Sequence, residues 1–375
     1  MAEATDSSTT ARASAPVPAL DVPGRAGATA PTQRLTGIDA ARGLALIGMI
    51  VVNVGPVEAD GLLHRLYLLP YGRASVLFVV IAGIGMGLML RPRPGAGRQW
   101  RVVVWRAAVL LLGGLALQRL TDDVSVILPV YGVLFLLALL VHRAPRAVLL
   151  GLALAMTVVG PVLYVSHLMA AGRDHHSGPP LELGNPVAEV LHGLVLSGRY
   201  PLVTWCVPFL VGLWFSRLDL RDRGVLARLV VWGTVAAVVA FGLSLVSMSI
   251  LDRDGDVGAA RLLTGAAHGQ MPLWLVSSVG GALAVVAGLV LLGARGARVA
   301  GPLVAAGRLA LTLYVLHVLV LALLTPADGF TLARGAAVSA LMIASFLGLA
   351  VVWRRVTEVG PLEWVLRASW LRTAA

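Results

Sequence analysis

RLTGIDAARGLALIGMIVVN (residues 34–53) and GRASVLFVVIAGIGMGLML (residues 72–90) are two apolar runs that flank a short polar segment. Asp39 and Arg42 stand near the start of the first run, and Arg73 near the start of the second. Each run approaches the length of a helix that crosses a membrane. The rest of the chain repeats this pattern, which predicts a bundle of membrane helices rather than a pair of buried helices in a soluble domain.

Composition indicates the same class of protein. Of the 375 residues, 58% are hydrophobic and 13% are charged, whereas soluble domains carry about 25% charged residues. Ten apolar stretches predict ten spans, at residues 34–53, 72–90, 102–120, 124–141, 147–169, 200–216, 227–250, 271–293, 306–324 and 335–353. We therefore expect an all-helical, polytopic integral membrane bundle in which residues 34–375 form a single domain.

The distribution of arginine predicts how the bundle is oriented. The chain has no lysine, and 22 of its 30 arginines fall on one side of a ten-span arrangement, with 8 on the other. The positive-inside rule then predicts a multi-pass protein of the plasma membrane with both termini in the cytoplasm. Residues 1–33, rich in Ala, Ser, Thr and Pro, are expected to be a disordered cytoplasmic tail. The net charge of +11 thus reflects topology, and no soluble basic domain for a nucleic-acid partner is expected.

Several short motifs resemble known binding sequences but lack part of the required pattern. GIGMG (83–87) follows no strand, so we interpret Gly83 and Gly87 as a small-residue face for helix packing rather than as a dinucleotide loop. DRDGD (252–256) lacks the glycine and the closing glutamate of a calcium loop. Cys206 is the only cysteine, and the histidines match no metal-binding spacing. No metal site is predicted.

Ionisable residues inside the spans are candidates for function. His317 falls about midway along the ninth span, although a neutral histidine bonded to a neighbouring helix would explain it equally well. Asp39 and Arg42 share a helix face, and Asn53 lies three turns further along that face. Arg308 reaches the same cytoplasmic depth. We expect these four residues to line a polar stripe; the simpler interpretation of Asp39 and Arg42 is a helix-start carboxylate beside an anchoring arginine.

Six motifs, taken in order, resemble a family of uncharacterised bacterial membrane proteins over about residues 34–367. The first is the opening run at 34–53, and the second contains Gly72, Arg73, Leu77 and Phe78. The third is the GRYPLVTW element (198–205), followed by Ser216, Arg217, Asp219 and Leu220. The last three are AAHGQMP (266–272), GRLALTLYVLH (307–317) and GPLEW (360–364). Ser216 replaces the family's glycine. That family is related to the heparan-alpha-glucosaminide N-acetyltransferases, within a wider superfamily of transmembrane acyltransferases.

The resemblance implies an enzyme that takes an acyl group from cytosolic acyl-CoA, such as acetyl-CoA, and delivers it across the membrane. The acceptor would be a cell-envelope saccharide or another small molecule. Characterised relatives place a catalytic histidine in the first external loop, and His64 is nearest to that position. Asp39, Arg42, Asn53 and Arg308 are the candidates for binding the co-substrate, since the guanidinium fork matches phosphate.

The external histidines are the candidates for chemistry. An acyl-accepting hydroxyl or amine needs a base, or a nucleophile that carries the acyl group, and histidine suits both roles near neutral pH. We predict that His64 and His268 converge beside Arg73, with His317 as the next candidate; two unrelated loop histidines are the alternative. Two other functions stay open. One is a transporter or permease that uses His317, Asp39 and Arg42, and the other is a non-catalytic membrane partner. Association into a homo-oligomer is compatible with either.

Overall fold

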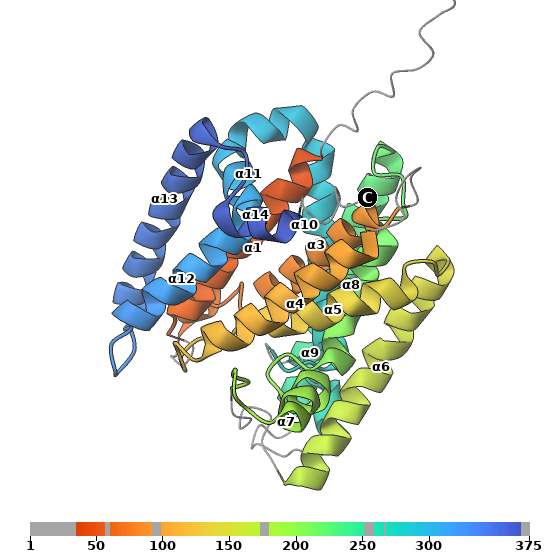
Figure 1. Ribbon diagram of the computed structural model, residues 1–375. Coiled ribbons are helices and arrows are strands. Elements are labelled where there is room, and N and C mark those ends of the chain that lie inside the picture. The colour runs from red at the N-terminus through yellow and green to blue at the C-terminus, as the bar shows by residue number, and fades with distance from the viewer. Residues whose placement is uncertain are drawn as a thin grey trace, which may run out of the picture. The chain divides into compact units, whose positions relative to one another are not determined.

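The computed structural model describes residues 35–56, 61–91, 99–172, 180–250, 259–265 and 268–368, within which all regular secondary structure is helical (Figure 1). The expected tail at 1–33 lies outside the described residues. The helices are α1 (Thr36–Val54), α2 (Leu62–Tyr67), α3 (Arg73–Met89), α4 (Gln99–Gln118), α5 (Leu128–Val141), α6 (Arg146–Ala171), α7 (Val187–His192), η1 (Gly193–Ser197), α8 (Leu202–Phe215), α9 (Arg223–Ile250), η2 (Ala259–Leu263), α10 (Pro272–Val299), α11 (Gly301–Arg308), α12 (Ala310–Leu324), α13 (Leu332–Val356) and α14 (Pro361–Arg367).

The long helices are those of a membrane protein. Within the described part of the chain, six helices are long and apolar enough to cross a membrane, and the number rises to eight if two bent pairs each form one span. Two shorter apolar helices, α3 and α5, accompany them. Each of the ten apolar ranges marked in the sequence overlaps one of these helices. The all-helical membrane class is therefore confirmed, while the short helices α2, α7, α11 and α14 were not predicted.

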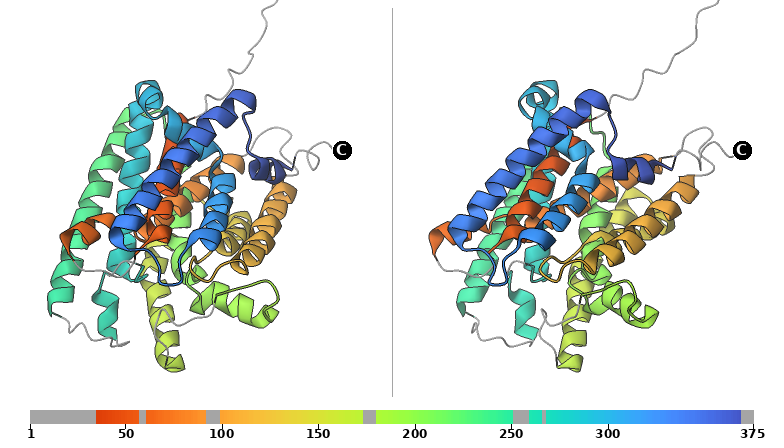
Figure 2. Two further views of the ribbon diagram at one scale, coloured as in Figure 1. Left: turned by 90° about the vertical axis from the view of Figure 1, so that its left-hand side faces the viewer. Right: turned by 60° about the vertical axis from the view of Figure 1, so that its left-hand side comes forward.

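Helix α1 lies at the centre of the bundle. It packs against α3, α10, α11, α12 and α13, and Figure 2 shows α13 running beside it. Of the residues in the apolar segment of α1, 61% are buried, whereas in α9 only 17% are buried. Helices near the periphery, such as α6 and α9, leave Leu154, Val158, Trp232 and Val238 exposed. Exposed apolar side chains cost little free energy when they face hydrocarbon, because lipid tails are as apolar as leucine.

Small residues allow α3 and α8 to approach closely. A Cβ atom at Gly83 would overlap the carbonyl oxygen of Phe209, and one at Gly212 would overlap that of Val80. One turn further, a Cβ at Gly87 would overlap the hydroxyl of Ser216. The interpretation of Gly83 and Gly87 as a packing face is therefore confirmed.

Arginine side chains close the ends of two helices. The Arg91 guanidinium donates to the carbonyl of Ser216, the residue that follows α8. The Arg217 guanidinium donates in the same way to the carbonyl of His142, which follows α5. The last carbonyls of a helix have no partner within it, and a cation there also offsets the negative end of the helix dipole. These arginines therefore donate hydrogen bonds to carbonyls at the ends of α8 and α5, in addition to any effect on topology.

The predicted ninth span, 306–324, is not one continuous helix. It divides at Leu309 into α11 and α12, which meet at an angle of 82°. In a continuous helix the Leu311 N–H would bond to the Gly307 carbonyl. Here the Gly307 carbonyl accepts from Arg42 instead, at 3.2 Å, and the Leu311 N–H donates to Glu363, at 2.7 Å. Two side chains from distant parts of the chain thus replace the hydrogen bond that is lost at the break.

The C-terminal helix α14 holds this break in place. The Glu363 carboxylate accepts from the N–H groups of Leu311 and Thr312, and from the Thr312 hydroxyl at 2.6 Å. It therefore caps the N-terminus of α12 from 51 and 52 residues away in sequence. At the other end of α14, Trp105 and Arg106 of α4 donate to the carbonyls of residues 365 and 366, at 2.9 Å and 2.8 Å. Both ends of α14 are thus bonded to neighbouring helices.

Replacing Glu363 with Ala is expected to destabilise the protein by about 1–2 kcal/mol, because at least two N–H donors of α12 lose their acceptor. Glu363→Gln should cost less, since its amide oxygen still accepts. The loss should appear as a lower midpoint of thermal unfolding in purified protein. The control is Glu358→Ala, an exposed position on the connection just before α14, for which the expected change lies within about 0.5 kcal/mol. Equal midpoints for Glu363→Ala and the control would contradict this role.

Candidate functional site

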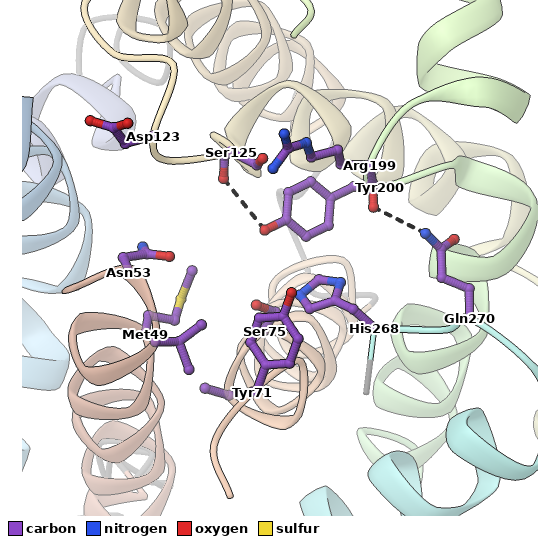
Figure 3. Close-up of a pocket in the computed structure, with 12 residues that line it drawn as sticks. Met49, Asn53, Tyr71, Ser75, Asp123, Ser125, Arg199, Tyr200, His268 and Gln270 are labelled. Carbon is purple, nitrogen blue, oxygen red and sulfur yellow. Dashed lines mark hydrogen bonds between the residues drawn. The ribbon is translucent and has the colours of Figure 1, made fainter. Parts of the chain in front are cut away.

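A cavity opens where five segments of the bundle meet, and we call it the polar pocket (Figure 3). Its volume is about 120 Å³, and it is partly open to the outside. Its lining comprises Met49, Val52, Asn53, Tyr71, Ala74, Ser75, Asp123, Ser125, Arg199, Tyr200, His268 and Gln270. Apart from the last turns of α1, these residues come from helix starts and connections that the sequence predicts to be external. The lining therefore combines an imidazole, two amides, several hydroxyls and two opposite charges.

His268 lies against four aromatic rings. The ring centroids of Tyr71, Tyr200, Trp205 and Trp274 are 5.0, 5.6, 5.9 and 6.0 Å from that of His268. The Trp274 indole is stacked on the imidazole at an interplanar angle of 24°. His268 is half-buried, so part of the ring still faces the cavity. Packing against these rings fixes the imidazole, and its exposed part lines the polar pocket.

The backbone that carries His268 has an unusual conformation. His268 and Gln270 both have positive φ, 59° and 61°, which is uncommon for residues other than glycine. Gln270, only 2% exposed, holds this segment. Its Nε2 donates to the Arg199 carbonyl at 3.1 Å, and its Oε1 accepts from the Thr204 hydroxyl at 2.7 Å. A backbone held in this way at a pocket wall is typical of functional sites.

Asn53 connects the pocket with the buried His317. The Asn53 side-chain amide donates to His317 Nε2 at 2.9 Å, which places the proton of a neutral imidazole on Nδ1. His317 is fully buried, and its ring packs edge-on against Tyr314 at 4.9 Å. The Tyr314 hydroxyl in turn accepts from the Ile127 N–H at 3.2 Å. His317 therefore lies behind the pocket and reaches it through Asn53.

The other predicted polar residues meet at the opposite end of α1. Asp39 is 4% exposed and accepts from two arginines, Arg42 at 3.0 Å and Arg308 at 3.3 Å. We call these three residues the Asp39 cluster. Asn53 was expected in the same stripe, but it lies about 16 Å further along α1 than Arg42 and contributes to the polar pocket. Asp39, Arg42 and Asn53 all bond to the segment that forms α11 and α12, so they lie along one side of α1 but belong to two different places on it.

The predicted convergence of His64 with His268 is not observed. His64 lies on α2, is 4% exposed, and donates from Nε2 to the Pro56 carbonyl at 3.1 Å. It does not line the polar pocket. Helix α2 is held by Tyr67, whose hydroxyl lies 3.0 Å from the Val51 carbonyl and 3.0 Å from the Ser339 hydroxyl. Burial raises the pKa of Tyr67, which keeps this hydroxyl protonated. The surroundings of His64 are therefore structural.

Arg73 also points away from His268. Its guanidinium lies over the ring of Phe241 on α9, with Cζ 5.3 Å from the ring centroid, in a cation–π contact. Nη1 is 3.5 Å from the Leu69 carbonyl. Tyr71 and Ser75, two residues away on either side, line the pocket instead. The sequence marked the correct connection but not the residue that faces the cavity.

Most of the pocket lining was not among the predicted site residues. Tyr200 belongs to the GRYPLVTW element and Gln270 to AAHGQMP, so the motifs of the resemblance did contain them. Tyr71, Ser75, Asp123 and Ser125 carry no motif of their own and were missed. The signal that could have found Tyr200 and Gln270 is their place in polar motifs at the ends of apolar runs. Within the described residues, no group of three or more His, Cys, Asp or Glu side chains could hold a metal ion.

The helices and the cavity define this chain as a helical membrane protein with a polar pocket among its helix ends. A family model described as a protein of unknown function, DUF418, matches residues 214–372. The match includes His268, Arg308, His317 and Glu363, and it begins after α1, the helix that contributes Asp39 and Asn53. No curated protein matches the chain.

Proposed function

We propose that this protein is a membrane-bound acyltransferase that moves an acyl group from cytosolic acyl-CoA to an acceptor in the polar pocket. In this proposal the bundle has ten spans in the plasma membrane, both termini lie in the cytoplasm, and the pocket opens outward. The observation that carries the proposal is His268, an imidazole fixed by aromatic packing at the wall of a polar, open cavity.

The pocket lining suits a polar acceptor. Asn53, Ser75 and Ser125 offer amide and hydroxyl groups, and Tyr71 and Tyr200 offer ring faces. A saccharide presents both hydroxyl groups and an apolar face, and so does a small amphipathic alcohol. His268 lies where it can accept the proton of the attacking hydroxyl or amine.

The transfer then balances in one step. The acceptor oxygen or nitrogen bonds to the thioester carbonyl carbon while its proton passes to His268. The carbon–sulfur bond breaks, and the proton that His268 took passes to the CoA thiolate, which leaves as the thiol and returns His268 to its neutral form. Asn53 is the amide donor on the side of the bundle core, where it can stabilise the oxyanion that develops on the carbonyl. If His268 carries the acyl group instead, its ring nitrogen first bonds to the carbonyl carbon as the carbon–sulfur bond breaks, and the acceptor then bonds to that carbon as the bond to His268 breaks.

The Asp39 cluster supports a co-substrate on the opposite side. Two guanidinium groups share a single carboxylate there, so the cluster carries one excess positive charge. The Arg42 side chain keeps 26% of its surface exposed. A phosphate of CoA is an anion that such a cluster can attract, because charge-assisted arginine–phosphate bonds are among the strongest polar contacts.

The direct test is an acyl-transfer assay in proteoliposomes. Purified protein is reconstituted with radiolabelled acetyl-CoA on one side and a panel of hexoses, amino sugars and polyols on the other. Labelled acceptor that depends on the protein would support the proposal. The absence of any labelled product from the whole panel, together with the absence of CoA release, would argue against it.

A transporter is the second candidate, and the broken helices favour it. Helices α11 and α12 meet at 82°, and the α7–η1 segment meets α8 at 63°. Discontinuous helices of this kind form substrate sites in many transporters. Uptake of a labelled pocket ligand into the same proteoliposomes, without acetylation, would favour transport over transfer.

The proposed topology predicts a labelling pattern. In a Cys206→Ser background, cysteines at Asp122 and Asp328 are expected to react with an impermeant maleimide added to intact cells. Cysteines at Arg221 and Glu358 should react only after the cells are permeabilised. All four positions are exposed, so reactivity reports sidedness rather than burial. Labelling of Arg221→Cys from outside would overturn the proposed orientation.

A further inference from the structure

The lining of the polar pocket contains two side chains of opposite charge, Asp123 and Arg199. Asp123 lies on the connection between α4 and α5, and Arg199 lies between η1 and α8. Both side chains are exposed, and Figure 3 shows them on different sides of the cavity. Among the residues that the structure describes, neither the carboxylate nor the guanidinium has an ion pair or a hydrogen bond. Both charges are therefore open to a ligand.

These two charges discriminate between ligands of different charge. An anion would gain a contact with Arg199 but would lie near the Asp123 carboxylate, and a cation would gain Asp123 but would lie near Arg199. A neutral ligand would displace water from both charges without pairing either, which costs free energy. A zwitterion pairs both, because its ammonium group and its anionic group each form charge-assisted hydrogen bonds. Charge complementarity therefore favours a zwitterion over the other three classes of ligand.

Neutral groups of the lining support the same division. The Asn53 amide donates to His317, which leaves its Oδ1 to accept from an ammonium group. Figure 3 shows Asn53 toward the same side of the cavity as Asp123, with Arg199 on the other side. Met49 adds an apolar surface to the lining. The pocket thus has an end for a cation, an end for an anion and a surface for a short carbon skeleton.

The volume of the polar pocket limits the size of this ligand. It is about 120 Å³, somewhat less than an engineered cavity of about 150 Å³ that binds benzene. The pocket therefore encloses about six to eight non-hydrogen atoms. A small amino acid has this size. The phosphoethanolamine head group of a lipid is similar, with the rest of the lipid outside the open side. Both molecules carry a primary ammonium group close to an anionic group.

We propose that the polar pocket binds a small zwitterion, with its ammonium group at Asp123 and Asn53 and its anionic group at Arg199. This ligand is the acceptor if the protein is a transferase, and in that respect the inference rests on the proposed function. The binding site itself does not depend on acyl transfer, so it can be tested with ligands alone.

The test compares ligands that differ by one charge, on full-length protein in the uncharged detergent octaethylene glycol dodecyl ether. L-Alanine carries both charges, propionate lacks the ammonium group, and L-alaninamide lacks the carboxylate. Isothermal titration calorimetry at constant ionic strength measures the three affinities. Alanine is expected to bind at least about 5-fold more tightly than propionate or alaninamide, since each of these loses one charge-assisted contact. The factor is smaller than for a buried pair because Asp123 and Arg199 are exposed.

Two substitutions should change the order of these affinities in opposite directions. Asp123→Asn removes the carboxylate that repels an anion, so propionate should bind at least as tightly as alanine. Arg199→Gln removes the guanidinium that repels a cation, so alaninamide should bind at least as tightly as alanine. Asp328→Asn and Arg334→Gln are the matched controls, since both residues are exposed and lie outside the pocket. They should keep the wild-type order. A general loss of folding cannot produce opposite changes in preference.

Three results would overturn the proposal. The first is equal affinity of the wild type for alanine and for either single-charge ligand. The second is the wild-type order of affinities in both Asp123→Asn and Arg199→Gln. The third is a lack of binding of both alanine and phosphoethanolamine. Binding of both or either in a manner that depends on the two charges would support the proposal. Tighter binding of phosphoethanolamine would then identify a lipid head group as the ligand, and tighter binding of alanine would identify a free amino acid.

The same measurements separate this site from the proposed function. Alanine binding that depends on Asp123 and Arg199, in a protein that neither labels an acceptor nor releases CoA, would keep the site and reject the transferase. Acyl transfer to uncharged acceptors, without binding of either zwitterion, would keep the transferase and reject the site.

Discussion

Replacing His268 with Asn is expected to lower kcat for acyl transfer by about 10²–10⁴-fold, the usual contribution of a general base. Asparagine loses the ring contacts with Tyr200 and Trp274, but its amide can still hydrogen-bond to a polar acceptor in the pocket. Binding of the acceptor should therefore change much less than turnover. Initial rates at saturating acetyl-CoA, measured against acceptor concentration, separate the effects on kcat and KM.

His192→Asn is the control for this substitution. His192 is an exposed histidine that contacts His167 and does not line the polar pocket. Its rate should equal that of the wild type. His64→Asn should lower the amount of folded protein rather than the rate per folded molecule, since His64 bonds to the Pro56 carbonyl. A His268→Asn variant with the wild-type kcat would remove His268 from the mechanism and leave His317 as the remaining candidate.

Replacing Asp39 with Asn is expected to destabilise the fold by about 2–3 kcal/mol. The change leaves two arginines without their shared counter-charge, and breaking a fully buried pair typically costs about 3–5 kcal/mol. The expected loss is smaller because Arg42 and Arg308 keep 26% and 14% of their side-chain surface exposed. Unfolding titrations with a denaturing detergent, on purified protein, measure the difference in free energy.

Glu358→Gln is the control, because it removes a carboxylate that is exposed and lies near the same end of the bundle. It should change the free energy of unfolding by no more than about 0.5 kcal/mol. A double-mutant cycle of Asp39→Asn with Arg308→Gln should show a coupling energy of at least about 0.5 kcal/mol, as expected for residues in direct contact. Strict additivity would mean that the ion pair contributes nothing to stability.

The motif GRLALTLYVLH has a structural explanation that its sequence alone does not suggest. Gly307 fits against the carbonyl of Asp39, where a Cβ atom would overlap it. Arg308 bonds to Asp39, and His317 bonds to Asn53. The break between α11 and α12 thus attaches this segment to α1 at two separate points. GPLEW has its explanation in the same place, because Glu363 caps α12.

The sequence alone determined the class of fold and the positions of the long helices. Each of the ten apolar runs is a local property, since the 3.6-residue repeat and the thickness of a bilayer act on consecutive residues. The pairing of Asp39 with Arg42 was predictable for the same reason, because residues three apart share a helix face. Asn53 shares that face as well, but its bond to His317 and its place in the polar pocket follow from tertiary packing.

Only the tertiary structure decided which residues meet. His268 lies against Tyr71 and Trp205 because three separate connections converge, and nothing in the sequence ranks those contacts above a contact with His64. The bend at Leu309 likewise depends on Arg42 and Glu363, which lie 265 and 52 residues from the groups they bond at the break. Hydrogen bonds over such distances in sequence follow from the packing of whole helices. The sequence therefore specified the helices and one ion pair, while the packing of the helices specified the pocket.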